Sequence, residues 1–364
     1  MMSNTSDSPL STSSHSNEKG NDTGSTQYSQ GYDSQARLEQ AVAALQAGDI
    51  VAFPTETVYG LGADARNPAA VAKIFAAKGR PADHPLIVHL ADIAQLEHWA
   101  QAIPETAYQL AEAFWPGPLT LILRKQPSVA DIVTGGQSTV GLRIPQHPVA
   151  LALLQAFGDG IAAPSANRFG RISPTTASHV HAEFSDDPPL ILDGGACTYG
   201  LESSIIDLSS SQARLLRPGS LSLSSLQECL GTVLEQPSKP AKALVASSDP
   251  VPRVSGSLSS HYAPSTPAYR SDFTSIYRYV QAQTAQERAR VGLLLRRPWP
   301  SHYPPVALAI QLADNPSGYG YKLYSSLRRL DSMGLQSILV EQAPEEATWL
   351  AVADRLQRAT EPLP

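Results

Sequence analysis

The chain has 364 residues, of which 42% are apolar, and it carries a formal net charge of −6 at pH 7. This length predicts two or three domains, and the acidic balance argues against tight nucleic-acid binding by the whole surface. The two cysteines, Cys197 and Cys229, are far apart and form neither a zinc spacing nor a disulfide framework, so a cytoplasmic location is expected. No apolar run could cross a bilayer and no signal peptide is evident, so no membrane association is expected.

The N-terminal segment differs in composition from the rest of the chain. Residues 1–33 are rich in Ser, Thr and Asn and poor in large apolar residues, which predicts a disordered tail. Order is expected to begin near Ala36, where Leu38, Ala41 and Leu45 form a helical apolar stripe.

Residues 34–222 predict a first, α/β domain, because strand-like and helical runs alternate along them. Strands are expected at 50–53, 86–90, 119–123, 140–144, 161–163, 190–192, 204–208 and 214–216, and helices at 69–78, 107–114 and 147–157. The helix at 69–78 has the clearest boundaries, because Asn67 suits the N-cap, Pro68 suits the first turn and Gly79 suits the end.

The remainder predicts a linker and a smaller domain. Residues 223–267 are assigned to the linker, since most of them lie in a stretch rich in Pro, Ser and Ala, and a linker of this length suits a lid. Within 268–364, strands are expected at 291–295, 306–311 and 337–340, and amphipathic helices at 323–330 and 349–356. This pattern predicts a Rossmann-like domain with a parallel sheet.

The segment 53–62, Phe-Pro-Thr-Glu-Thr-Val-Tyr-Gly-Leu-Gly, follows a predicted strand at a position where α/β folds place ligands. Its two glycines and Ala65 match a loose dinucleotide fingerprint, but the next helix begins only beyond them, so a nicotinamide-dependent enzyme is disfavoured. A tight turn without a ligand is the alternative. The hydroxyl of Thr57 would suit a small polar substrate.

A lysine and an arginine stand two residues apart in Lys78-Gly79-Arg80-Pro81. An Arg can fork onto phosphate oxygens while a Lys acts as a point charge, although basic residues at a helix end also complement the helix dipole. Downstream, Ser165 and Asn167 emerge from an apolar strand and could give oriented hydrogen bonds, or form an ordinary turn. Together these residues predict a nucleotide triphosphate site without a Walker loop.

Two polar residues interrupt apolar strands and therefore need partners. His89 lies in 86–90, and Arg143 lies in 140–144. A buried Arg must be paired, either with a substrate carboxylate or in an internal salt bridge, and the sequence leaves both open.

Taken in order, the motifs resemble the threonylcarbamoyl-AMP synthase family, which is built on a YrdC-like domain. The resemblance runs through 54–62, 78–81, 85–89, 115–118, 139–145, 164–167, 203–204 and 217–219, and continues to 256, 261–264 and 314–316. It implies a YrdC-like twisted, mostly mixed sheet with flanking helices, a long linker and a smaller Rossmann-like parallel α/β domain.

The resemblance also implies a reaction, in which L-threonine, bicarbonate or CO2, and ATP give threonylcarbamoyl-adenylate and pyrophosphate. The product would pass to the downstream threonylcarbamoyl-transferase machinery, which forms threonylcarbamoyladenosine beside the anticodon of tRNA. Mg²⁺ would accompany ATP, and the protein itself is expected to hold no metal site. Weak direct tRNA binding is left open.

By resemblance, the ATP site would be lined by Lys78, Arg80, His84, Thr139, Ser165, Asn167, Ser173 and Arg217. The threonine site would be lined by Thr57, His89, Arg143, Ala163 and Ser203. Arg143 would take the threonine carboxylate as a bidentate pair, and Lys78 and Arg80 would be the catalytic cations. The chain departs from the family at His84, where Asn is usual, and at Ser257, where Met is usual.

Three other functions are weighed against this one. An RNA-binding module is favoured by the local basic residues Arg66, Lys73, Lys78 and Arg80, but the acidic net charge and the lack of interleaved aromatics argue against it. Carbamoyl transfer in hydrogenase maturation uses a related domain with zinc-binding Cys clusters, which are absent here. A nicotinamide-dependent enzyme is the least favoured. No general base is evident from the sequence.

Overall fold

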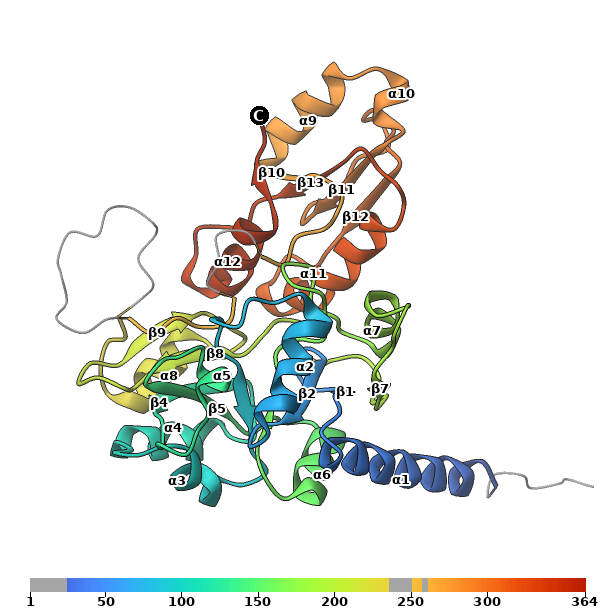
Figure 1. Cartoon of the computed structure of the whole chain (residues 1–364). Helices are drawn as coiled ribbons and strands as arrows, with labels where there is room; N and C mark the ends of the chain where they lie inside the picture. The colour runs from blue at the N-terminus through green and yellow to red at the C-terminus, as the bar shows by residue number, and fades with distance from the viewer. Residues whose placement is uncertain (1–24, 236–250, 257–260) are drawn as a thin grey trace, which may run out of the picture.

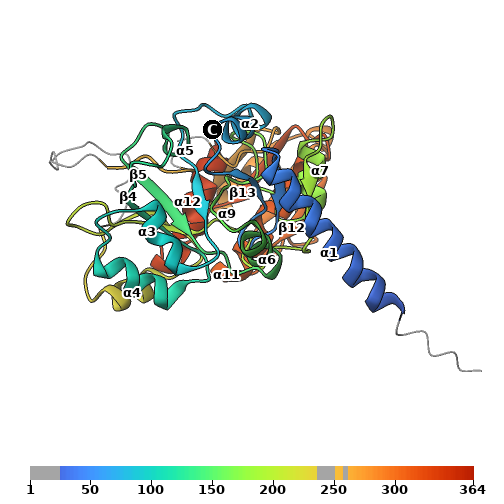
Figure 2. The same cartoon turned by 60° about the horizontal axis from the view of Figure 1, so that its bottom comes forward.

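The computed structural model describes residues 25–235, 251–256 and 261–364, and these build two sheet-containing domains (Figure 1). Helix α1 (Ser25–Gln46) begins inside the tail predicted over 1–33, of which residues 1–24 lie outside the described residues. Its C-terminal half packs on the first domain through the buried Ala41 and Leu45, while its N-terminal half extends away from the body (Figure 2). None of the helices in the described ranges is long and apolar enough to cross a membrane.

The first domain is centred on a mixed sheet. Among the described residues its nine strands follow the order β7-β1-β2-β6-β3-β5-β4-β8-β9. The strands are β1 (Val51–Phe53), β2 (Gly60–Asp64), β3 (Ile87–His89), β4 (Leu119–Arg124), β5 (Thr139–Arg143), β6 (Ile161–Ala162), β7 (Leu190–Ile191), β8 (Ser204–Asp207) and β9 (Arg214–Arg217). The sheet contains parallel pairs such as β3–β5 and antiparallel pairs such as β4–β5, which confirms the predicted mixed sheet.

Strand β2 is the element that the sequence reading missed in this sheet. The two glycines assigned to a strand-to-helix turn lie instead in β2, which pairs antiparallel with β1 and sets Val51 opposite Gly62. A Cβ atom on Gly62 would lie 2.7 Å from both Ile161 Cγ2 and Phe53 Cε1. The glycine is therefore explained by close packing within the sheet, and not by a phosphate-binding turn.

Helices cover the first sheet. They are α2 (Pro68–Lys78), η1 (Ile93–Gln95), α3 (Leu96–Trp99), α4 (Glu105–Phe114), α5 (Asp131–Thr134), α6 (Pro148–Phe157) and α7 (Ala177–Glu183). Helix α2 has the predicted ends, because Asn67 accepts the N–H groups of Ala69 and Ala70, and Gly79 takes a left-handed φ of 61°. This helix carries Lys78 to the edge of the site.

The second domain has a parallel sheet of five strands among the described residues, in the order β12-β11-β13-β10-β14, as the Rossmann-like prediction requires. The strands are β10 (Ala268–Ser271), β11 (Val291–Leu295), β12 (Leu308–Gln311), β13 (Ser337–Glu341) and β14 (Glu361–Pro362). The helices are α9 (Phe273–Ala282), α10 (Ala285–Arg288), α11 (Pro316–Asp331), η2 (Ala347–Trp349) and α12 (Leu350–Ala359).

The linker contains a helix, contrary to the sequence reading. Helix α8 (Leu223–Leu230) starts at an N-cap provided by Ser222 and buries Leu226. Residues 236–250 and 257–260 of the predicted linker lie outside the described residues. The described stretch 251–256 returns to the first domain, where Val254 packs on Ile87, Ile122 and Ile205 of the sheet.

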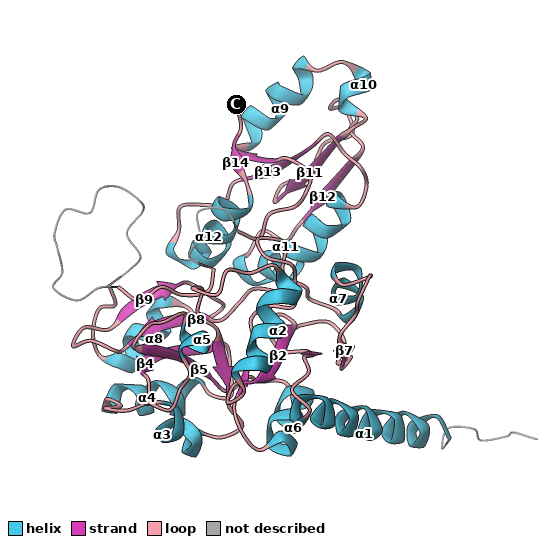
Figure 3. Ribbon diagram, in the orientation of Figure 1, coloured by secondary structure: helices cyan, strands magenta, loops and turns pink. Residues whose placement is uncertain are grey.

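The two domains share apolar packing. Helices α11 and α12 lie between the second sheet and the first domain (Figures 1 and 3). Val58, Ile172 and Leu201 of the first domain belong to the same buried cluster as Leu323 and Leu327 of α11. The domains therefore meet through a continuous core.

Candidate functional site

A cavity of about 40 Å³ lies between the first sheet with its adjoining loops and the linker. Predicted site residues in its wall are Thr57, His89, Arg143, Ala163, Ser165 and Arg217. The wall also contains Ser255, His261 and Tyr262 from the linker. The structure thus brings together residues that are up to 160 positions apart, from Thr57 to Arg217, and adds a cover from the linker.

Arg143 forms the internal ion pair that the sequence left open. Its Nη2 lies 2.7 Å from Oε1 of Glu56 and donates a 2.9 Å hydrogen bond to Oγ1 of Thr57, and its Nε donates to the carbonyl of Gly117 at 3.3 Å. Its Nη1 has no hydrogen bond to a described residue. A ligand carboxylate would therefore meet Nη1 first, and the predicted bidentate pairing would also require Nη2 to be shared with Glu56.

Two buried histidines, His89 and His261, lie in the cavity wall. Burial, and then the charge of Arg143, lower the pKa of His89 to about 3. Burial lowers the pKa of His261 to about 3 against the opposing effect of Glu202, helped by nearby cations. Both imidazoles are therefore neutral at physiological pH, and neither is poised to act as a general base near pH 7.

Three buried cations lie beside the cavity without a carboxylate partner. The exposed fractions are 3% for Lys78, 6% for Arg80 and 4% for Arg217. No carboxylate oxygen of a described residue lies within the 4.0 Å ion-pair limit of any of these side chains. Burial, and then the charge of Arg80, lower the pKa of Lys78. Such charges are costly to bury alone, so this arrangement suits an anionic ligand.

The three cations contact mainly backbone oxygens. Lys78 Nζ donates to the carbonyls of Ser165, at 2.5 Å, and Asn167. Arg80 Nη2 donates to the carbonyl of Pro85 at 3.0 Å, and its Nε is buried with no partner among the described residues. These contacts fix the side chains in place without an ion pair to a carboxylate of a described residue.

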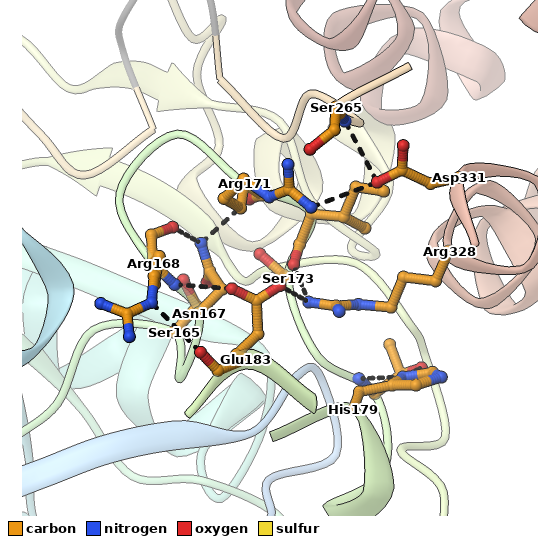
Figure 4. A network of polar contacts seen from close by, with 12 residues as sticks. Ser165, Asn167, Arg168, Arg171, Ser173, His179, Glu183, Ser265, Arg328 and Asp331 are labelled. Carbon is orange, nitrogen blue, oxygen red and sulfur yellow. Dashed lines mark hydrogen bonds and ion pairs between the residues drawn. The ribbon is translucent and has the colours of Figure 1, made fainter. Parts of the chain in front are cut away.

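The loop that follows β6 carries three of the predicted ATP residues (Figure 4). Ser165 forms an isolated bridge with Gly60 of β2. Asn167 Nδ2 donates to the carbonyls of Arg168 and Arg171 at 2.7 and 2.9 Å. Ser173 donates to Oε1 of Glu202 at 2.6 Å. The loop is therefore held by its own side chains and by Glu202.

Comparisons with known proteins identify the family of this chain. A family model for the Sua5, YciO and YrdC domain, described as telomere recombination, matches residues 43–219. A second model, described as the threonylcarbamoyl-AMP synthase C-terminal domain, matches residues 221–360. A threonylcarbamoyl-AMP synthase of Pyrococcus abyssi is 39% identical over 329 residues, covering 89% of this chain and 94% of the relative. The chain belongs to the threonylcarbamoyl-AMP synthase family.

Other relatives of the family are similar over much of the chain. The threonylcarbamoyl-AMP synthase of Schizosaccharomyces pombe is 38% identical over 364 residues, covering 90% of this chain and 89% of the relative. Among solved structures, P. abyssi Sua5 complexed with L-threonine aligns with a TM-score of 0.78 at 38% identity, covering 89% of this chain and 95% of the other.

Some predicted residues of this family member lie outside the main cavity. Thr139 lines a neighbouring hollow, which shares Ile87 and Ser255 with the cavity. His84 lies against Phe169, with ring centroids 5.3 Å apart. Ser203 is fully buried beneath the cavity, where its hydroxyl is 2.8 Å from that of Thr120.

Three residues that complete the site were not among those predicted from the sequence. Glu202 lines the cavity, and Arg355 and Tyr324 from the second domain bind Glu202. A signal for Arg355 existed, because it lies on the same helical face as the buried Val352 and Ala359. A charged residue on an apolar helix face needs a buried partner.

The basic residues of the RNA-binding alternative do not form a free surface in this family member. Arg66 stacks on Trp99 at 3.8 Å and pairs with Asp159, and Lys73 pairs with Asp49. Lys78 is buried. The alternative therefore loses the feature that favoured it.

Within the described residues, no group of three or more His, Cys, Asp or Glu side chains could hold a metal ion.

Proposed function

We propose that this chain is an L-threonylcarbamoyladenylate synthase, which condenses L-threonine, bicarbonate or CO2, and ATP to threonylcarbamoyl-AMP and pyrophosphate. The observation that carries the proposal is the group of buried cations without carboxylate partners among the described residues, Lys78, Arg80 and Arg217, beside a small cavity. Membership of the synthase family and the likeness to a threonine-bound relative support it.

The cationic half of the site would bind ATP. Lys78, Arg80 and Arg217 would neutralise the triphosphate, and the residues proposed to line it further are His84, Thr139, Ser165, Asn167 and Ser173. The neighbouring hollow with Thr139 has apolar walls that include Ile122 and Ile205, which suits a purine ring. The position of His84 against Phe169 would place it at the edge of this half.

The other half would bind L-threonine. Arg143 Nη1 would take the carboxylate, and Thr57, His89, Ala163 and Ser203 would surround the side chain and amine. The neutral state of His89 suits this role, because a buried imidazolium would oppose Arg143. The closeness of the two halves would bring the amine near the α-phosphate.

The proposed reaction has two chemical steps. The deprotonated amine of threonine attacks CO2, forms an N–C bond and releases a proton, which gives a carbamate. A carbamate oxygen then attacks the α-phosphorus of ATP in line, the bond to the β-phosphate oxygen breaks, and pyrophosphate leaves. The protein contributes positioning and charge neutralisation by Lys78 and Arg80, so no covalent intermediate with the protein is required.

We further propose Mg²⁺ as the cofactor that accompanies ATP. The described residues offer no cluster of carboxylates, which fits an ion held by phosphate oxygens and water instead of a protein cage. When bound, the ion would supply further charge neutralisation at the phosphates. Removal of Mg²⁺ with EDTA should abolish product formation, and adding excess Mg²⁺ should restore it.

The linker would act as a lid over the nucleotide. The cavity has room for only a few water molecules, so ATP can enter only if Ser255, His261 and Tyr262 move. Gly256 has a φ of 83°, and a Cβ there would lie 2.1 Å from Oη of Tyr262. Gly256→Ala should therefore prevent closure and raise the KM for ATP, whereas an unchanged KM would argue against the lid. The contact expected of Ser257 lies outside the described residues.

The direct test is to incubate the protein with ATP, bicarbonate and isotopically labelled L-threonine and to search for labelled threonylcarbamoyl-AMP by mass spectrometry. Lys78→Ala should greatly reduce its formation, because the triphosphate loses a fixed cation. Lys73→Ala, in an exposed ion pair on the same helix, is the control and should behave as wild type. Absence of product with wild-type protein, or full activity of Lys78→Ala, would overturn the proposal.

The cellular context is also a proposal. The reactive adenylate would be consumed by threonylcarbamoyl-transferase machinery acting on tRNA, and direct binding of tRNA by this chain would be weak. Both cysteines are free, which agrees with a cytoplasmic location. A salt-dependent gel shift with tRNA would measure the direct binding.

A further inference from the structure

Arg355 is a second-domain residue whose guanidinium is fully buried against the first domain. Its Nε donates a 2.8 Å hydrogen bond to Oε2 of Glu202, and its Nη1 donates a 2.9 Å hydrogen bond to the carbonyl of Pro218. These two acceptors stand directly beside Ser203 and Arg217 in the chain. One side chain from α12 therefore holds the carboxylate of the residue before a proposed threonine residue and the backbone of the residue after a proposed ATP residue.

Tyr324, from α11, binds the same carboxylate. Its hydroxyl donates to Oε2 of Glu202 at 2.9 Å and lies 3.2 Å from Oε1. Ser173, a proposed ATP residue, donates to Oε1 at 2.6 Å. Burial alone would raise the pKa of Glu202, but the charges of Arg355 and Arg217 and these hydrogen bonds lower it to about 2. The carboxylate therefore stays charged and fully engaged, which leaves it unsuited to act as a base.

Ser203 and Arg217, which flank this carboxylate and Pro218, contact each other directly. Arg217 Nε donates to the Ser203 carbonyl at 3.1 Å, and Nη2 donates to its hydroxyl at 3.0 Å. A Cβ on Gly219 would lie 2.2 Å from the backbone nitrogen of Ser204, so the two segments touch without a gap. A shift of either segment would consequently move Arg217 in the cavity wall.

We propose that Arg355 and Tyr324 are positioning residues for the synthase reaction, which act from the second domain through Glu202 and Pro218 on Ser173, Ser203 and Arg217. This inference rests on the proposed function. It gives the second domain a part in assembling the ATP site, although neither residue touches the cavity itself. A purely structural role at the domain interface is the competing explanation.

A second bridge holds the other side of the same region (Figure 4). Arg328 of α11 pairs with Glu183 of α7 at 2.9 Å and donates to the carbonyl of Ile172, beside Ser173. Glu183 Oε2 accepts the backbone N–H of Arg168 at 3.0 Å. Ser173 therefore lies between two anchors from the second domain, and the Arg355 anchor is the one that also reaches Arg217.

The test uses the full chain and compares Arg355→Met, Arg355→Lys and Tyr324→Phe with matched controls on α11. Arg329→Met replaces an exposed arginine, and Tyr321→Phe replaces a partly exposed tyrosine. For each variant, kcat and the KM for ATP and for threonine are measured from labelled threonylcarbamoyl-AMP. All assays are run well below the variant's own melting temperature, with folding checked by circular dichroism.

We expect Arg355→Met to lower kcat/KM for ATP by about 100-fold, since a displacement of about 1 Å can cost that much. Tyr324→Phe should lower it by about tenfold, because Glu202 loses one of its donors. Arg355→Lys should recover only part of the loss, because an ammonium does not reproduce the fixed geometry in which the guanidinium donates to Glu202 and to Pro218 at once. Both controls should retain wild-type constants.

The outcomes separate the explanations. Variants that melt earlier but keep wild-type kcat and KM when folded would show a structural role alone and overturn this inference. Full rescue by Arg355→Lys would overturn the claim that simultaneous hydrogen bonds to Glu202 and Pro218 are required. If the wild-type chain forms no threonylcarbamoyl-AMP, both the proposed function and this inference fail. If the wild-type chain is active and the folded variants match it, only this inference fails, so the two failures are distinguishable.

Discussion

Two regions of this molecule contain buried arginines, and these arginines differ in whether a carboxylate lies beside them. Beside the cavity, Arg80 and Arg217 have no carboxylate partner among the described residues. At the domain interface, Arg355 lies 2.8 Å from Glu202 and 2.7 Å from Asp354. Unpaired buried charge is costly to the fold and is expected where a ligand supplies the counter-charge, whereas paired charge connects parts of the fold. For Arg80, Arg217 and Arg355, the presence or absence of a carboxylate partner therefore indicates which arginine binds a ligand and which positions other residues, whereas Arg143 combines an ion pair to Glu56 with a place in the cavity wall.

The largest effect should come from Arg80→Met, a substitution in the unpaired region. Product formation should fall by about 100- to 1,000-fold, because a fixed cation at the developing charge is lost. The free energy of unfolding should nevertheless rise by about 0.5–2 kcal/mol, as expected when a functional but costly group is removed. Mass spectrometry of the product and urea unfolding would measure the two changes. A lower free energy of unfolding in Arg80→Met would contradict the conclusion that this unpaired buried charge is costly to the fold.

The matched substitution in the paired region is Arg355→Met. It should lower the free energy of unfolding by about 3–5 kcal/mol, because Glu202 would remain charged and buried without its main partner. The lowered pKa of Glu202 contributes stability above its unfolded pKa, which is lost as pH falls from about 4.5 towards 2. The stability difference between wild type and variant should therefore shrink below pH 4.5, which unfolding curves at several pH values would reveal. A pH-independent difference would contradict the ion-pair explanation.

A third prediction concerns the neutral histidine His89 in the cavity wall. The pKa of His89 is lowered to about 3, so its neutral form contributes stability that is complete above about pH 6.5 and is lost as pH falls towards 3. This one residue should cost up to about 1.4 kcal/mol per pH unit in that window. His89→Gln should flatten the pH dependence of unfolding relative to wild type. The pKa of His179 is also lowered, to about 4. The pH dependence of unfolding of His179→Gln should therefore be measured beside that of His89→Gln.

The smallest effect should follow Lys73→Ala. Lys73 and Asp49 form an ion pair whose side chains are 48% and 61% exposed, and such pairs contribute about 0–1 kcal/mol. Stability should change by less than about 0.5 kcal/mol and activity should not change. A clear loss of tRNA binding in this variant would instead revive an RNA-binding surface.

Much of the fold followed from local pattern in the sequence. Helix α2 was predicted with both ends because Asn67 and Gly79 act within a few residues of the backbone groups that they satisfy. Strand β2 was missed because its glycines are explained by contacts with Phe53 and Ile161, which is 99 positions beyond Gly62. The helical start of α1 within a polar segment also went against its composition.

Some site residues were predicted from the sequence and others were not, again because a sequence shows local patterns and not contacts between distant residues. Arg143 and His89 stood out because each interrupts an apolar strand, and both line the cavity. The choice between a ligand and an internal partner for Arg143 could not be made, since Glu56 meets it only after β1 and β5 are assembled in one sheet. Glu202 directly precedes the predicted 203–204 motif but had no assigned role, because two of its partners come from the second domain.

The shared apolar cluster has a consequence for how the chain unfolds. Val58 and Leu201 of the first domain pack with α11 of the second, so separating the domains would expose a hydrophobic surface on each. The two sheets should therefore denature together in one calorimetric transition, as one cooperative unit. A linked pair of independent modules would instead melt in two steps, and could be exchanged between proteins without penalty.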